Sequence, residues 1–134
     1  MMNALNALAL AAAVLVGPTW PATAVAEPYL VMVEQPGCIY CERWDAEIGP
    51  AYPKTDEGKF APLIRADLRQ GPPEGITYAR RVLFTPTFVL IDNGQEQARI
   101  EGYPGEDFFW PLLTKLLEDN TDFATSTGAE TVGN

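Results

Sequence analysis

Two cysteines, Cys38 and Cys41, stand three residues apart and are the only cysteines among the 134 residues. Thiols at this spacing can form and break a disulfide within one helical turn, and the thiolate is the nucleophile in disulfide exchange. A structural zinc site normally takes four Cys or His ligands, and the chain has no histidine. An inert structural disulfide is the alternative, but a bridge closing so short a loop constrains the unfolded chain little. We therefore expect redox chemistry, with no metal and no other cofactor.

The residues around the pair predict two different environments for the two sulfurs. Residues 29–35 are typical of a strand, Pro36-Gly37 ends it, and a helix should begin near Cys38. At an exposed helix N-terminus the macrodipole lowers the pKa of a thiol, which favours Cys38 as the attacking group. Cys41 begins the stripe Cys41, Trp44, Ile48, Tyr52 at the spacing of a buried helix face, where burial raises a thiol pKa. We predict that Cys38 attacks and that Cys41 resolves the mixed disulfide.

Two further residues near the pair have open interpretations. Glu34, at the end of the strand, is expected either to accept the proton of Cys41 or to be a solvated acid. Tyr40, between the cysteines, either shapes a groove for the partner or covers the helix turn.

The rest of the chain predicts an α/β fold in the order β-α-β-α-β-β-α. Strands are expected at 62–68, 85–92 and 95–101, and Asn93-Gly94 predicts a tight hairpin between the last two. A short helix is expected at 76–81. A final helix is expected at 107–118, with Pro111 in its first turn, where a missing N–H costs least. This order predicts a central mixed four-stranded sheet flanked by helices.

The two ends of the chain differ from the part between them. Residues 1–26 contain an apolar stretch, a Gly-Pro break and small residues at positions 24 and 26, which is typical of a cleaved secretory signal peptide. No basic residue precedes the apolar stretch, so an uncleaved anchor remains the alternative. Residues 27–118 are expected to form one domain, and 119–134 a flexible acidic tail. We therefore expect export to the periplasm.

The overall charge excludes some partners. The net charge is −9, from 18 acidic and 9 basic residues. Nucleic-acid binding needs clustered basic side chains, so we expect no nucleic acid as a partner.

Gly37-Cys38-Ile39-Tyr40-Cys41, the strand before it and Thr85-Pro86-Thr87-Phe88 together resemble the active site of the thioredoxin superfamily. The resemblance implies the thioredoxin fold and a thiol–disulfide oxidoreductase activity. It also implies that Pro86 is cis and that the Thr85 backbone pairs with a bound peptide. Gly37, Ile39 and Tyr40, which differ from the usual Trp and Gly-Pro at these positions, would contact the substrate. Thioredoxins carry a buried aspartate where this chain has Met32, so Glu34 would have to substitute for it.

The segment Glu-Gln-Pro-Gly-Cys-Ile-Tyr-Cys-Glu-Arg-Trp is more similar to the periplasmic thioredoxins of bacterial sulfur-oxidation (Sox) systems. This likeness implies a monomeric reductase that keeps a cysteine of the sulfur-carrier SoxYZ complex reduced. Electrons would come from a membrane donor of the thiol–disulfide relay type. Two alternatives stay open: an oxidant or isomerase for folding exported proteins, and a non-catalytic binding module of the same fold.

Overall fold

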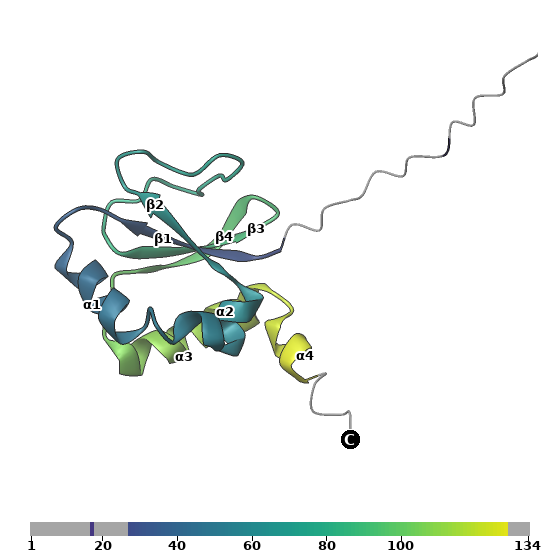
Figure 1. Ribbon diagram of the computed structural model, residues 1–134. Coiled ribbons are helices and arrows are strands. Elements are labelled where there is room, and N and C mark those ends of the chain that lie inside the picture. Colours follow the sequence, from purple (N-terminus) through teal and green to yellow (C-terminus); the bar gives the residue numbers. More distant parts are fainter. Residues whose placement is uncertain (1–16, 18–26, 129–134) are drawn as a thin grey trace, which may run out of the picture.

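The structure is a computed structural model that describes Gly17 and residues 27–128, so the expected signal peptide lies outside the described residues. Four strands form one mixed sheet in the order β2-β1-β3-β4 (Figure 1). β1 pairs with β2 in parallel, whereas β3 pairs antiparallel with both β1 and β4. The strands are β1 (Tyr29–Glu34), β2 (Leu63–Asp67), β3 (Thr87–Asp92) and β4 (Gln95–Glu101). The predicted mixed four-stranded sheet is confirmed.

The helices gather on one face of this sheet, as Figure 1 shows. They are α1 (Ile39–Glu47), the 3-10 turn η1 (Tyr52–Lys54), α2 (Asp56–Phe60), α3 (Glu106–Asn120) and α4 (Phe123–Gly128). Trp44 of α1 is fully buried beneath the sheet, and its ring lies 5.4 Å from Phe88 of β3 and 5.8 Å from Phe109 of α3. Ile48 and Tyr52 are also buried. The stripe predicted from the sequence is therefore the inner face of α1 and the turn after it.

The opposite face of the sheet is covered by the loop at 68–86, and the helix predicted at 76–81 is wrong. Thr77 instead makes an isolated parallel bridge with Gln95 at the start of β4. Gly71 and Gly75 have positive φ, with Pro72 and Pro73 between them. Proline lacks an N–H and left-handed φ is incompatible with an α-helix, so this lead-in favours a loop that can be pinned to β4. Val82 of the loop belongs to the same buried cluster as Val31, Val33, Val89 and Ile91.

The C-terminal part corrects two expectations. Pro111 is inside α3, at the sixth residue counted from Glu106, rather than in the first turn. Its ring leaves the carbonyl of Asp107 without a helical donor, which an exposed first turn can tolerate because water replaces it.

The expected flexible tail at 119–134 is wrong as far as residue 128. α3 continues to Asn120, and α4 follows. Phe123 is 4% exposed and packs edge-on against Phe60, with the ring centroids 5.2 Å apart. Phe123 therefore packs α4 against α2. Among the described residues, no helix is both long and apolar enough to cross a membrane.

Candidate redox site

The two cysteines lie where β1 ends and α1 begins. Gly37, with φ +77°, makes the turn between these elements, and Cys38 is the N-cap of α1. Cys38 and Cys41 are joined in a disulfide with their Cα atoms 5.2 Å apart. A strand held in the middle of the sheet and a helix packed by Trp44 thus set the position of both sulfurs.

The environments of the two sulfurs differ as the sequence predicted. Cys41 is 4% exposed and belongs to the core cluster on the helix side of the sheet, whereas Cys38 is half-buried. The backbone N–H of Cys41 donates to Cys38 Sγ at 3.2 Å. A helix N-terminus offers unpaired N–H groups and positive partial charge, so it stabilises an anion on the outer sulfur.

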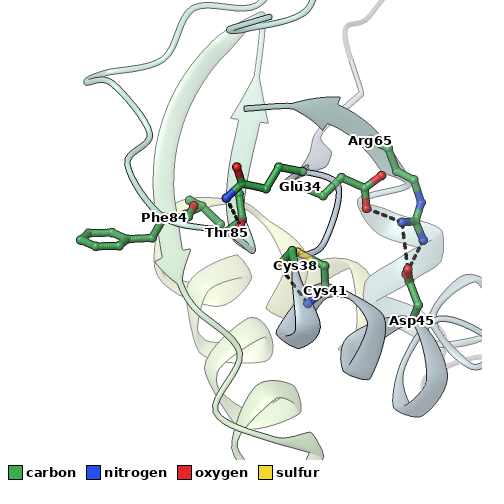
Figure 2. Close-up of a disulfide and its surroundings, with 9 residues drawn as sticks. Glu34, Cys38, Cys41, Asp45, Arg65, Phe84 and Thr85 are labelled. Atoms are coloured by element: carbon green, nitrogen blue, oxygen red, sulfur yellow. Dashed lines mark hydrogen bonds and ion pairs between the residues drawn. A yellow bond between two sulfur atoms is a disulfide. The ribbon is translucent and has the colours of Figure 1, made fainter. Parts of the chain in front are cut away.

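The peptide bond between Thr85 and Pro86 is cis, as the resemblance implied. The side chain of Gln35 donates from Nε2 to Thr85 Oγ1 at 3.0 Å across fifty residues of sequence. Figure 2 shows Thr85 beside the disulfide, with Phe84 directed away from it. The segment before the cysteines and the segment before β3 are thus joined by a side-chain hydrogen bond.

Glu34 ends β1, and its carboxylate is paired with a cation. Met32 and Glu34 share a strand face, which turns Glu34 toward α1. Arg65 Nη1 contacts Glu34 Oε2 at 2.7 Å, and Arg65 Nη2 contacts Asp45 Oδ1 of α1 at 2.6 Å (Figure 2). The hydrogen bond with Asp45, together with the charge of Glu34, raises the pKa of Arg65.

These side chains enclose a cavity next to the disulfide. Its volume is about 420 Å3, and Glu34, Gly37, Cys38, Cys41 and Arg65 are among its lining residues. Glu34 and Cys41 therefore line one cavity. The side chain of Glu34 is 32% exposed, so burial alone does not decide between the proton acceptor and the solvated acid that the sequence left open.

An apolar groove lies on the other side of the cis-proline. It encloses about 680 Å3 and is lined by Tyr40, Phe84, Thr85, Pro86, Ile100, Glu101, Gly102, Tyr103, Pro104 and Leu112. Tyr40, Phe84 and Leu112 are 55%, 60% and 45% exposed and lie together along it, and contiguous apolar side chains, unlike single ones, mark binding surfaces. Ile39 is 71% exposed at the first turn of α1 and does not line this groove. The structure therefore brings Tyr40, Thr85 and Pro86 together.

A hydrogen-bonded group on the far side of α1 holds the helix against the β4–α3 turn. Tyr103 donates to Glu47 Oε2 at 2.5 Å, and Arg43 donates to Glu47 Oε1 at 2.8 Å. The hydrogen bonds from Arg43 and Tyr103 lower the pKa of Glu47, while burial and the bond to Glu47 raise the pKa of Tyr103.

Sequence reasoning missed Gln35, Asp45, Arg65 and Phe84. Arg65 could be placed only once β2 was paired with β1, because its Cα is opposite Met32 in that register. Gln35 and Phe84 precede Pro36 and Thr85, and nothing in their local pattern indicates that their loops meet.

The comparisons with known proteins agree with this geometry. A family model described as a thioredoxin-like domain matches residues 22–117. The crystal structure of the reduced periplasmic thioredoxin SoxS from Paracoccus pantotrophus is 59% identical, with a TM-score of 0.67. That match covers 69% of this chain and 97% of that chain.

Two other solved structures are more distant. Trxlp from Edwardsiella tarda is 23% identical with a TM-score of 0.46, covering 73% of this chain and 84% of that one. A thioredoxin from Malassezia sympodialis is 20% identical with a TM-score of 0.43, covering 67% of this chain and 75% of that one. No curated protein matches the sequence significantly. Because the family model spans most of the chain and carries the Cys-x-x-Cys pair within it, the chain belongs to the thioredoxin-like domain family.

Proposed function

We propose that this protein is a periplasmic thiol–disulfide oxidoreductase that reduces a disulfide on a protein partner. The observation that carries the proposal is the asymmetry of the pair: a reachable sulfur at a helix N-terminus and a sheltered sulfur one turn further on. An inert disulfide would need neither the N–H donor at Cys38 Sγ nor an apolar groove beside it.

The reaction proceeds in two exchange steps. The Cys38 thiolate attacks one sulfur of the partner disulfide, the partner S–S bond breaks, and the second partner sulfur leaves as a thiolate. Cys41 then loses its proton and attacks Cys38 Sγ, which releases the remaining partner sulfur. Two electrons pass to the partner, and Cys38–Cys41 becomes the disulfide.

We assign the proton acceptor for Cys41 to Glu34. Its carboxylate lines the same cavity as Cys41, and Arg65 holds it at the end of β1. General bases typically contribute about 10²–10⁴-fold when they are correctly placed.

Partner recognition in this proposal uses both sides of the cis-proline. The Thr85 backbone pairs with an extended segment of the partner, and Tyr40 and Phe84 contact its apolar side chains. Gly37 and Ile39 flank the attacking sulfur, and Ile39 is 71% exposed there, where it can contact the partner.

The cellular assignments rest on similarity. The relative at 59% identity is a periplasmic thioredoxin SoxS, and residues 1–26 have the pattern of a cleaved signal peptide. We propose the same compartment for this protein, a cysteine of the SoxYZ sulfur-carrier complex as the group it keeps reduced, a membrane thiol–disulfide relay as its electron donor, and a monomeric state.

Equilibration with glutathione tests the direction of electron flow. A reductase should have a potential near that of thioredoxin, about −270 mV, whereas strong oxidants lie near −120 mV. A Cys41→Ser variant, expressed in the native host, should accumulate a mixed disulfide on Cys38 whose attached protein can be identified by mass spectrometry. An oxidising potential, or an adduct with many unrelated folding proteins, would contradict the reductase assignment.

A further inference from the structure

The loop that leads to the cis-proline is fixed to β4 by a nearly buried ion pair, Glu96 with Arg99. The two side chains are 3% and 4% exposed, and Arg99 donates to both carboxylate oxygens of Glu96 at 2.6 and 2.7 Å. None of the chemistry proposed above uses this pair. Burying two charges is costly unless they are well paired, so we expect an ion pair buried beneath a loop to have a structural or functional role.

A bulge in β4 brings these two side chains together. Residues three apart in a regular strand point to opposite faces of the sheet. The register shifts between Leu90 and Ile91, so that Arg99 lies opposite Val89 and Glu96 lies opposite Ile91. Val89 and Ile91 both face the loop-covered side of the sheet. The extra residue of the bulge therefore turns Glu96 to the same face as Arg99.

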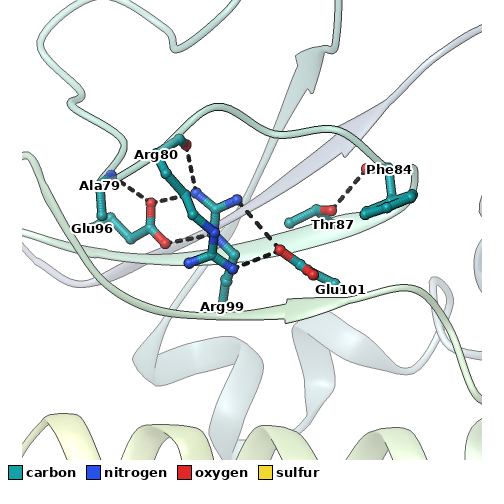
Figure 3. Close-up of polar contacts among 7 residues, drawn as sticks. All are labelled: Ala79, Arg80, Phe84, Thr87, Glu96, Arg99 and Glu101. Carbon is teal, nitrogen blue, oxygen red and sulfur yellow. Dashed lines mark hydrogen bonds and ion pairs between the residues drawn. The ribbon is translucent and has the colours of Figure 1, made fainter.

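The ion pair holds the loop through backbone groups. The amide of Ala79 donates to Glu96 Oε2 at 2.7 Å, and Arg99 Nη2 donates to the carbonyl of Arg80 at 2.8 Å (Figure 3). The Arg80 side chain adds a contact to Glu101 at 2.7 Å. One acid and one base on β4 thus satisfy a donor and an acceptor in consecutive loop residues.

These contacts with β4 come shortly before the groove, because Arg80 precedes Phe84, the first groove residue of the loop, by four positions. After Arg80 the chain passes through buried Val82 and reaches Phe84, whose carbonyl accepts from Thr87 Oγ1 at 2.8 Å. Phe84 and Thr85 line the apolar groove beside Cys38. No helix stiffens this loop, so the polar ties of residues 79 and 80 to β4 and the packing of Val82 act together with the Gln35–Thr85 hydrogen bond to set where Phe84 and Thr85 lie.

We propose that Glu96 and Arg99 are positioning residues that hold the loop before the cis-proline in the place required for binding an extended partner segment. The inference deepens the proposed function and rests on it. It predicts a selective loss: an extended substrate needs the loop in place, whereas a small reagent needs only access to Cys38 Sγ.

The test compares two thiols that open the Cys38–Cys41 disulfide. One is dithiothreitol, and the other is a short synthetic peptide with a single cysteine between leucines. Arg99→Met removes the cation and keeps most of the aliphatic stem. The rate constant for the peptide should fall by about tenfold relative to the wild-type protein, because the segment that binds the peptide is misplaced. The rate constant for dithiothreitol should stay within about twofold of the wild-type value. Hydrogen exchange at the amides of residues 79–85 should become faster.

Lys115→Met is the matched control, because it removes one cation from an exposed pair with Asp119 on α3 and should change neither rate. Glu96→Gln keeps the shape of the acid and should give the same selective loss as Arg99→Met. If Arg99→Met does not fold by circular dichroism, Arg99→Lys replaces it in the comparison.

An unchanged ratio of the two rate constants in the folded variants overturns the inference, and so does an equal fall in both. Failure of the proposed function is a different result. In that case the wild-type protein would show an oxidising potential, or its disulfide would resist both thiols, before any variant is compared.

Discussion

Cys38 and Cys41 are chemically identical residues whose surroundings make them different reagents. Cys38 accepts a hydrogen bond from a helix N–H and is partly open to solvent, whereas Cys41 packs in the core near Trp44. The difference comes from one helical turn, because position 38 caps the helix and position 41 is on its inner face.

Alkylation of the reduced protein checks this difference directly. Iodoacetamide at neutral pH should label Cys38 at least about tenfold faster than Cys41, because only the outer sulfur is a stabilised and reachable anion. Peptide mapping by mass spectrometry gives the two rates. Equal rates, or faster labelling of Cys41, would contradict the assignment of roles.

Glu34 offers a second prediction at the scale of single residues. Glu34→Gln should slow the decay of a mixed disulfide between Cys38 and a chromogenic thiol by about tenfold or more, since the proton acceptor of Cys41 is lost. Raising the pH should restore the rate, because hydroxide then deprotonates Cys41. Stopped-flow absorbance measures the decay.

Asp45→Asn is the control for Glu34→Gln, because it removes the other carboxylate that contacts Arg65. If both variants slow the decay equally, or if the rate does not recover at higher pH, Glu34 acts only through its ion pair with Arg65 and is not the proton acceptor of Cys41.

At the scale of elements, α3 keeps its inner face despite a proline. Phe109, Leu113, Leu116 and Leu117 are buried, and the exposed Pro111 lies on the outer side. The packing of the apolar stripe thus outweighs the loss of one hydrogen bond. Interior proline costs a helix about 3 kcal/mol relative to alanine, and core packing of several large side chains exceeds this.

Pro111→Ala should therefore stabilise the protein. The variant regains a donor for the Asp107 carbonyl, and no buried contact is lost because Pro111 is exposed. Proline also restricts the unfolded chain, by roughly 0.4–1 kcal/mol, which offsets part of the gain. We expect the free energy of unfolding to rise by about 1–2 kcal/mol, measured by urea denaturation at an unchanged m-value. A decrease would show that Pro111 has a role in packing or in the geometry of α3.

At the scale of the whole molecule, Glu96 links the loop at 68–86 to β4, and the protonation of its carboxylate makes this link depend on pH. Burial alone would raise the pKa of Glu96, but hydrogen bonds from Arg99 and from the amide of Ala79 lower it overall. A carboxyl whose pKa is lower in the folded chain than in the unfolded chain stabilises the fold at pH values above its unfolded pKa. That contribution is lost as the pH falls through the folded pKa.

The free energy of unfolding should accordingly fall as the pH drops below the ordinary glutamate value of 4.5. The Glu96→Gln variant, which carries no titrating group there, should show a shallower fall over the same range. Urea denaturation between about pH 3 and pH 6 measures both slopes. Identical slopes would mean that Glu96 titrates alike in the folded and unfolded chains.

The sequence by itself determined the elements whose signals are local. A continuous apolar run, a 3.6-residue pattern and a turn dipeptide each depend on neighbouring residues, so they predicted β1, α1 and the Asn93-Gly94 hairpin. The Cys-x-x-Cys spacing and the N-terminal position of Cys38 likewise needed no long-range contact. The resemblance to thioredoxins added the cis geometry of Pro86.

Only the tertiary structure decided the features that depend on pairing between distant segments. The 76–81 segment lost its expected helix because it is tied to β4, and Phe123 became core because α2 lies against it. Arg65 meets Glu34 through the β1–β2 register, and Glu96 meets Arg99 through a bulge. The local sequences around these residues do not predict such contacts, because the contacts form only when folding of the whole chain brings the two segments together.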